Sequence, residues 1–386
     1  MRCYSTKLWV FTPFCSTYKS NSPSIIQFII ITLINGLHLL SQLQKMVSKS
    51  FRIYVWFVLV NIFLVIVAGS VVRTTQSGMG CPDWPTCFGS AIPPTSVKEV
   101  QFQPNHNYKK GQFIIYNDSL KYAIKKFGSS IGYNPQNWQQ YEKHNNAAFS
   151  VVTTWIEYLN RLLGALLGIF ITVQFIWGLW FWKQQKAIVF LSFILILLTG
   201  FQAWLGKTVV DSNLAALKIS LHLFGALAMV FLCLYILFLA KGRSVISTTK
   251  KVYFLNIALL LMVIVQIILG TNVRGQIDAI AEQLNYVNRS GWIEQLNIYF
   301  YVHRSFSLAI AALAIYLLLQ TKNHFKAAQL FKNVIAVIII EIVVGVVLVY
   351  ANFPAAAQPV HLLVSSILVA FVFNNYLQLK AATPTN

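Results

Sequence analysis

Charged residues are scarce in this chain. Only 10% of its 386 residues are Asp, Glu, Lys or Arg, whereas 57% are hydrophobic and the mean hydropathy is +0.62. A soluble domain carries far more charge on its surface, so that class is excluded. Several apolar runs approach or exceed the ~20 residues that cross a bilayer, which identifies a polytopic membrane protein.

Acidic residues are the scarcest charged type. The chain has 10 Asp and Glu against 30 Lys and Arg, a formal charge of +20. Such an excess can indicate a nucleic-acid partner. Here the basic residues are spread over the loops that flank apolar runs rather than gathered in one patch, so we expect the lipid bilayer and no nucleic acid as their partner.

Eight apolar runs have the length of membrane-spanning helices, with ends placed to within a few residues. They lie near 53–72, 155–182, 187–206, 217–240, 252–271, 300–320, 331–350 and 359–379. All should be helices, because lipid offers no partner to an unpaired backbone. The expected fold class is therefore all-α integral membrane.

Basic residues mark one side of this arrangement. They precede the first run and follow the second, fourth, sixth and eighth, so the positive-inside rule places both termini of the core in the cytoplasm of a cell inner (plasma) membrane. The opposite, outer loops are 73–154, 207–216, 272–299 and 351–358. The first of these is also lysine-rich, notably over 98–143, but a loop of that length is translocated largely regardless of charge.

The first 45 residues fit this topology badly. Residues 24–43 form a further apolar run, either a signal-like segment or a ninth span, and a ninth span would put 44–52 outside against their charge. Met46, followed by VSKSFR and a clean span, is the better start. We therefore interpret 1–45 as an extension that is not native or is dispensable.

The two halves of the chain repeat each other. LGTNVRG repeats AGSVVRT, YVHRSFSLAI repeats YLNRLLGALL, and VHLLVSSILV matches LHLFGALAMV. The matches pair Arg274 with Arg73, His303 with Asn160, and His361 with His222. Four spans cross an even number of times, so the halves share one orientation. This predicts two pseudo-symmetric four-helix bundles, 46–240 with the long outer loop and 241–386.

Three histidines, His222, His303 and His361, lie one or two turns from the outer ends of their spans, and Asn160 takes the fourth place. A histidine inside a membrane is costly and usually functional. Two facing histidines at one depth can hold a haem iron, so we assign His303 and His361 as axial ligands of a haem b. A zinc or copper site is the competing interpretation, but it needs further Cys, His or carboxylate ligands, and none is evident at that depth in the second half.

The second span carries a charged motif in EYLNRLLGALLG. Its spacing puts Glu157, Asn160 and Arg161 on one helical face. A carboxylate this deep should face the bundle and either pair with Arg161 or stay protonated. Beside an oxidisable substrate it would accept a proton or position a water, and a purely structural pair with Arg161 is the alternative.

Two further features lie at the outer face. Arg73 and Arg274 end the first and fifth spans, where they either meet haem propionates or snorkel to the interface. In GMGCPDWPTCFG, Cys81 and Cys87 lie close together on the side that is oxidising in bacteria. They form either a structural disulfide or a labile dithiol beside a redox site.

Taken together, these motifs resemble the haem A synthases of aerobic respiration. The resemblance covers roughly 46 to 380 and rests on GSVVRTTQSG leading into CPDWP at 69–85, on EYLNR at 157–161, and on the histidines of spans four, six and eight. It implies an enzyme that oxidises a rim methyl of haem O to a formyl to give haem A, with haem b in the C-terminal half and the substrate haem in the N-terminal half. Haem O synthase and terminal oxidase assembly would be its partners. The electron partner stays unidentified and the oligomeric state open, a homo-oligomer included.

The resemblance also assigns roles by position. His222 would ligate the substrate haem, with Asn160, Arg161 and Arg73 around it, and Glu157 would be the catalytic carboxylate. Arg274 would lie with haem b. The family pattern in the second span is Glu-x-x-His-Arg, and here the histidine is replaced by Asn160. The substrate iron would then be five-coordinate on His222, or bound on its other face by water or the amide.

Other classes of protein fit some of the same features. The runner-up is a b-type membrane cytochrome that passes electrons between quinol and an acceptor without porphyrin chemistry. A transporter with a parallel repeat comes third, because paired histidines explain less there.

Overall fold

Eight membrane-length helices form the body of the protein, as the sequence predicts. A computed structural model describes residues 47–142, 149–212 and 214–381, so the extension 1–45 and Met46 lie outside the described residues. The eight helices are α2 (Lys49–Thr74), α4 (Val151–Gly178), α5 (Lys186–Asp211), α6 (Ala216–Ala240), α7 (Lys250–Gln283), α8 (Ile298–Thr321), α9 (Phe325–Tyr350) and α10 (Ala357–Gln378). The protein is therefore a multi-pass membrane protein of the all-α class.

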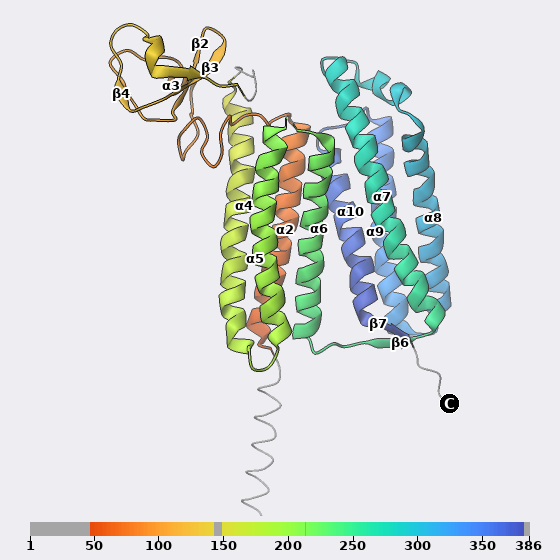
Figure 1. Cartoon of the computed structure of the whole chain (residues 1–386). Helices are drawn as coiled ribbons and strands as arrows, with labels where there is room; N and C mark the ends of the chain where they lie inside the picture. Colours follow the sequence, from red (N-terminus) through yellow and green to blue (C-terminus); the bar gives the residue numbers. More distant parts are fainter. Residues whose placement is uncertain (1–46, 143–148, 213, 382–386) are drawn as a thin grey trace, which may run out of the picture. The chain divides into compact units, whose positions relative to one another are not determined.

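The helices pack in two rings. In the first half α2 packs on α4, α4 on α5, α5 on α6, and α6 on α2; in the second half α7, α8, α9 and α10 pack in the same cyclic order (Figure 1). Helix α10 also packs on α2 and α6, which joins the rings. Helices α4, α6, α8 and α10 all begin at the end of the bundle that carries the long loop (Figure 1).

Local sequence explains where the helices start and which face they bury. The side chains of Ser48, Ser150 and Thr249 accept hydrogen bonds from the first turns of α2, α4 and α7, and so act as N-caps. Buried residues recur on α2 at helical spacing: Phe51, Val55, Val58, Leu59, Ile62 and Ile66. Other large apolar side chains are exposed, among them Trp180 just after α4 and Phe254 on α7. Exposed apolar side chains are expected on a surface that meets lipid.

The fifth span differs from its prediction. It was expected near 252–271 with a loop from 272 to 299, but α7 continues to Gln283. The added turns bury Val273, Ile277 and Ile280 in a cluster with Trp292 and Phe300. Apolar residues spaced four and three apart make this segment amphipathic, so packing continues the helix although its other face is polar.

The long loop between α2 and α4 contains strands that the sequence analysis did not predict. Its elements are α3 (Val97–Val100), β1 (Asn107–Tyr108), β2 (Phe113–Tyr116), β3 (Ser119–Ala123), β4 (Phe127–Gly128), η1 (Pro135–Asn137) and β5 (Trp138–Gln140). Strands β2, β3 and β5 form an antiparallel sheet, and β1 pairs with β4. Asn117 and Asp118 join β2 to β3 with positive φ at both residues, as a two-residue hairpin turn requires.

Four other short elements of the described residues lie between the membrane helices or just after the last one. They are η2 (Leu179–Phe181) after α4, η3 (Arg289–Gln295) between α7 and α8, and the strands β6 (Ile246–Thr248) and β7 (Leu379–Ala381). Strands β6 and β7 pair in parallel, which ties the linker between the halves to the chain just after α10. They lie at the end of the bundle opposite the long loop (Figure 1).

Candidate functional site: a polar layer facing four glycines

Four polar side chains lie near the starts of their helices, at the end of the bundle that carries the long loop. Asn160 on α4, His222 on α6, His303 on α8 and His361 on α10 are called the polar layer below. One atom of each is buried without a hydrogen-bond partner: Oδ1 of Asn160 and Nδ1 of the three histidines. A buried polar atom without a partner is costly, so side chains that carry such atoms are candidates for a functional role.

In the second half the two histidines lie close together. The ring centroids of His303 and His361 are 6.4 Å apart, with an angle of 78° between the rings. Each ring also lies against a glycine of the preceding helix. A methyl group at Gly270 of α7 would come within 3.1 Å of Cε1 of His303, and one at Gly345 of α9 within 3.5 Å of Cε1 of His361. Gly270 therefore leaves space that the His303 ring occupies, whereas a methyl group at Gly345 would make an ordinary contact with His361.

The first half repeats this arrangement with one change. A methyl group at Gly206 of α5 would lie 3.5 Å from Cε1 of His222. One at Gly69 of α2 would lie 3.9 Å from Oδ1 of Asn160. Each member of the polar layer thus faces a glycine on the helix before it. The match of LGTNVRG with AGSVVRT pairs Gly270 with Gly69, whereas the equivalence of Gly345 and Gly206 is seen only in the structure.

A partly buried carboxylate lies beside the polar layer in the second half, contrary to the expectation from the sequence. No carboxylate was expected at that depth, but Oε1 of Glu341 on α9 lies 3.3 Å from Nδ1 of His361. Its other oxygen, Oε2, is buried without a partner. The expectation failed because depth was compared only among the histidine-bearing spans. Among the described residues, no group of three or more His, Cys, Asp or Glu lies close enough together to hold a metal ion.

The first half has an amide where the second has Glu341. Gln202 lies four residues before Gly206, as Glu341 lies four residues before Gly345. Its side chain is buried, has neither amide atom hydrogen-bonded, and fills the space next to Gly225 on α6. The two halves therefore differ at two equivalent positions of the site, Asn160 against His303 and Gln202 against Glu341.

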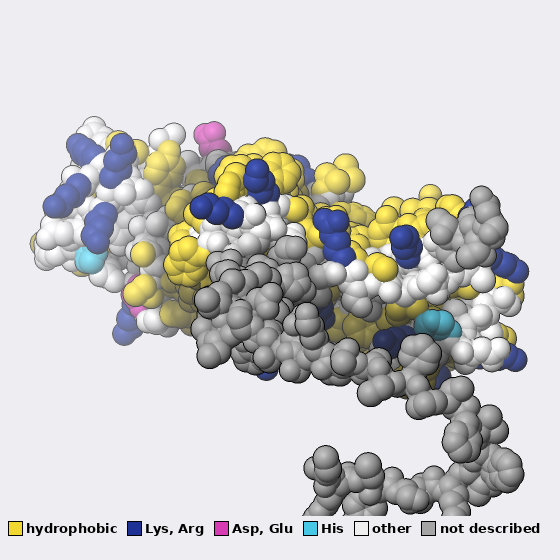
Figure 2. All heavy atoms as spheres, turned by 90° about the horizontal axis from the view of Figure 1, so that it is seen from below, with side chains coloured by type: hydrophobic (Ala, Val, Ile, Leu, Met, Phe, Trp, Pro, Cys, Tyr) yellow, Lys and Arg dark blue, Asp and Glu magenta, His cyan; other side chains and the backbone are white. Residues whose placement is uncertain are grey.

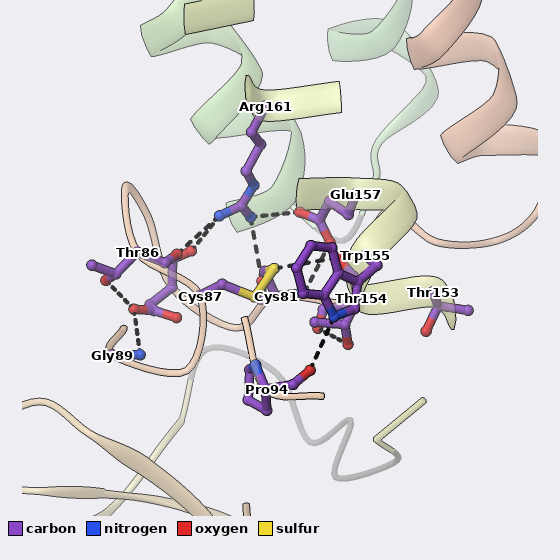
Figure 3. The surroundings of a disulfide bond; sticks show 12 residues. Cys81, Thr86, Cys87, Gly89, Pro94, Thr153, Thr154, Trp155, Glu157 and Arg161 are labelled. Carbon is purple, nitrogen blue, oxygen red and sulfur yellow. Dashed lines mark hydrogen bonds and ion pairs between the residues drawn. A yellow bond between two sulfur atoms is a disulfide. The ribbon is translucent and has the colours of Figure 1, made fainter. Parts of the chain in front are cut away.

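Glu157 and Arg161 hold the start of the long loop. Glu157 pairs with Arg161 at 2.5 Å, and its Oε2 accepts a hydrogen bond of 2.9 Å from the backbone N–H of Cys81. Arg161 donates to the backbone carbonyls of Asp83 and Thr86 at 2.6 and 3.1 Å (Figure 3). Both side chains are largely buried, with 4% and 15% exposure. Pairing with Arg161 is one of the two arrangements expected for Glu157 from the sequence, and the pair anchors the loop to α4.

The loop held in this way contains a disulfide between Cys81 and Cys87 (Figure 3). Both cysteines are buried, with 0% and 1% exposure. The Asp83 carboxylate closes the loop, since it accepts hydrogen bonds from the Thr86 hydroxyl and the Gly89 N–H. A sulfur covered on all sides is a poor partner for thiol exchange, which needs access of the attacking thiolate. The structural disulfide is thus the better of the two interpretations offered by the sequence.

Tyr141 closes the same loop from the other side. Its hydroxyl donates a 2.6 Å hydrogen bond to the carbonyl of Pro82. Burial, reinforced by the charges of Asp211 and Asp83, raises the pKa of Tyr141 to about 12. The phenol therefore keeps its proton and stays a donor over the physiological range.

Arg73 and Arg274 meet at one carboxylate. Asp278 of α7 binds Arg73 through Nε at 2.8 Å and Arg274 through Nη2 at 2.8 Å. Arg274 also donates to the side chain of Gln358 on α10. The sequence analysis expected haem propionates or snorkelling for these arginines and missed Asp278, which it placed in a loop.

These features define a class: a multi-pass membrane protein with two rings of four helices and half-buried imidazole side chains in both. A sequence profile of the cytochrome oxidase assembly protein family matches residues 52–128 and 127–373. The chain therefore belongs to that family, and the resemblance noted in the sequence is confirmed.

Curated relatives agree. The chain is 24% identical over 252 residues to the heme A synthase of Bartonella tribocorum, covering 62% of each chain. It is 26% identical over 243 residues to that of Shewanella oneidensis, again 62% of each. With the heme A synthase of Wolbachia pipientis wMel it shares 24% over 368 residues, 88% of this chain and 96% of the relative. The matches thus span about 62% of the length of the Bartonella and Shewanella relatives.

Proposed function

We propose that this protein is a haem A synthase, which oxidises a methyl group on the rim of haem O to a formyl group and so supplies haem A for terminal oxidase assembly. The observation that carries the proposal is the facing pair His303 and His361. Two imidazoles bound to one metal ion through bonds of about 2 Å would set their ring centres at most roughly 6 Å apart, when the rings lie on opposite sides of the ion. The 6.4 Å between the centroids is close to that value. The family and the relatives named heme A synthase support the same function.

The second half, residues 241–386, would hold haem b as a resident cofactor through His303 and His361. The 6.4 Å between the two ring centroids and the space that Gly270 leaves beside His303 support this assignment. When bound, haem b supplies one-electron transfer. The protein's part is to fix both imidazoles at one depth and to exclude water from them.

The first half, residues 46–240, would bind haem O as substrate through His222. Asn160 offers an amide where the second half has an imidazole, so His222 alone would hold the substrate iron and the Asn160 side would stay open. The parallel glycine contacts of His222 and Asn160 support a site of the same shape in both halves. A pseudo-symmetric pair of bundles, one specialised for substrate and one for electron transfer, follows from this assignment.

Glu157 would be the catalytic carboxylate of the first half. It lies one turn before Asn160 on the same face of α4, and its side chain is only 4% exposed. Oxidation of a methyl group releases protons, and a buried carboxylate near the substrate can accept one. Arg161 would keep Glu157 in place. The pairing also holds the disulfide loop, so structure and catalysis would share these two residues.

Arg73 and Arg274 would contact the propionates of the substrate haem and of haem b. They lie just over one turn beyond Gly69 and Gly270, the glycines that face the polar layer. Guanidinium groups bind carboxylates with two parallel hydrogen bonds, which makes them suited to propionates. Asp278 would then keep both arginines positioned between the halves.

The protein would lie in the cell inner membrane with both core termini in the cytoplasm. The end of the bundle opposite the long loop carries many basic side chains and few acidic ones (Figure 2), as expected for the cytoplasmic side. Exposed residues that flank the helices at this end are Lys183, Lys186, Lys241, Arg243, Lys250, Lys251, Lys322, Lys326, Lys332 and Lys380. The disulfide loop would then face an oxidising space, and haem O synthase and the oxidase would be the partners in the bilayer.

Co-expression with a haem O synthase tests the function directly. Extracted haems are identified by mass, and haem A should appear only when both proteins are present. A b-type cytochrome without porphyrin chemistry would give a haem b spectrum and no haem A. Such a result would reject the proposal. Glu157→Gln should keep haem O bound and convert it poorly, since the amide preserves the shape of the side chain and removes the base.

The two histidine sets should separate the two haem sites. His303→Ala or His361→Ala should abolish the low-spin haem b spectrum of the purified protein. His222→Ala should leave that spectrum intact while haem A production stops. An unchanged spectrum in both second-half variants would sink the haem b assignment.

A further inference from the structure

Glu341 is a partly buried acidic side chain that the proposed reaction does not use. It belongs to α9, its side chain is 16% exposed, and its Oε1 lies 3.3 Å from Nδ1 of His361. An acid inside a membrane bundle is expensive and is expected to have a function. The first ring of helices has Gln202 at the equivalent place, so the fold itself does not require an acid there.

When one nitrogen of an imidazole binds a metal, the other nitrogen carries a proton, and this limits the role that Glu341 can have beside His361. A neutral imidazole has one nitrogen with a proton and one with a lone pair. If Nε2 of His361 gives its lone pair to a metal, Nδ1 carries the proton and must donate it. In the structure Nδ1 has no hydrogen-bond partner, and Oε1 of Glu341 lies within reach of a small rotation of either side chain.

We propose that Glu341 is a positioning residue for His361: its Oε1 accepts the Nδ1–H hydrogen bond, fixes the ring orientation and leaves Nε2 free to bind the haem b iron. This inference rests on the proposed haem b site. An acid acceptor on the outer nitrogen of a metal-bound histidine makes the imidazole a stronger electron donor. Stronger donation favours the oxidised iron and lowers the midpoint potential of the haem.

The other ligand is held differently. Nδ1 of His303 has no partner, and the nearby Gln266 side chain donates instead to the backbone carbonyl of His303, at 2.9 Å. The electronic effect is therefore expected on one axial ligand only. In the first half, Gln202 lies against Gly225 rather than against an imidazole nitrogen. An effect of an acidic side chain on the midpoint potential is therefore expected only in the second half, which would hold haem b.

The experiment compares two leucine variants of the purified full-length protein with haem b bound. Glu341→Leu removes the acceptor at similar size, and Gln202→Leu makes the matched change in the first half. Redox titration of haem b should show an upward shift of the midpoint potential in Glu341→Leu, a smaller upward shift in Glu341→Gln, and none in Gln202→Leu. Glu341→Asp should bring the potential back toward that of the parent.

A second readout reports the geometry of the ligand. The low-spin ferric EPR signal should broaden or move in Glu341→Leu, since the His361 ring loses its fixed orientation, and stay unchanged in Gln202→Leu. Parental potential and EPR signal in Glu341→Leu would overturn the inference while the haem b site stands. Equal shifts in both leucine variants would also overturn it, because they would report general loosening. If the parent itself lacks a low-spin haem spectrum, the proposed function fails instead.

Discussion

Arg73 of α2 and Asp278 of α7 form an ion pair between the two halves of the protein, although 205 residues separate them in the chain. Asp278 also binds Arg274, the residue that the internal repeat matches with Arg73. Two repeated arginines thus share one carboxylate that has no counterpart in the first half, where the matching position is Ser77. The ion pair between the halves therefore depends on Asp278, a residue that the internal repeat does not share.

Asp278→Asn should weaken this junction. The change leaves two arginines near each other without a counter-charge, so thermal stability in detergent should fall. The Asp278 side chain is 38% exposed, and solvent screening limits each pair to on the order of 0.5 kcal/mol. Asp118→Asn, in the exposed hairpin turn of the long loop, is the control and should leave the melting temperature unchanged. Equal melting curves for Asp278→Asn and the parent would contradict the role given to Asp278.

Gly270→Ala should lower the haem b content of the purified protein. A methyl group there would come 3.1 Å from Cε1 of His303, so the ring must move away from its ligating position. Gly164→Ala on α4 is a matched control, because the added methyl group would have no atom within 4 Å apart from its chain neighbours and the nearby backbone of its own helix. The measurement is haem per protein from the absorbance spectrum. Full haem occupancy in Gly270→Ala would show that the glycine contact does not set the position of the ring.

Asn160→His should change the substrate haem and leave haem b alone. Gly69 leaves space beside this position, as Gly270 does beside His303. A second imidazole would then fill the open side of the iron that His222 holds and convert the bound haem O toward a six-coordinate low-spin form. The absorbance and EPR spectra of protein loaded with haem O report this change. A high-spin spectrum identical to that of the parent would mean that position 160 does not face the iron.

Cys81 and Cys87 should resist labelling in the folded protein. Alkylation without reduction, followed by mass spectrometry, should find neither cysteine modified, because both are in a disulfide and buried. A membrane-impermeant reductant added before alkylation should change little until the protein is unfolded. Rapid labelling under native reducing conditions would instead favour the labile dithiol that the sequence analysis offered as an alternative.

Length, hydropathy and charge were enough to predict the eight spans, because the membrane imposes its thickness on every helix. The polar layer could also be predicted, since three histidines and Asn160 recur at matched places in the repeat. Glu341 was missed because its partner His361 is on another helix, and contacts between helices leave no local pattern. Asp278 was missed because amphipathic packing carries α7 past its apolar run.

The long loop shows a different limit. Its β2–β3 hairpin had a readable signal, two polar residues that favour turns between FIIY and SLKYA. The anchoring of the loop by Glu157 and Arg161 leaves no signal in the sequence. The carbonyls that Arg161 binds belong to the backbone, so they do not depend on the type of side chain.

The parallel pairing of β6 with β7 joins the segment that follows α10 to the linker between α6 and α7. Ile246 pairs with Leu379, so the linker between the two rings of helices uses the residues after α10 as its partner strand. Removing the chain after Gln378 would leave all eight helices intact and still release the linker. A form of this protein that lacks β7 would therefore be altered in the linker between its two halves, far from the cut in the sequence.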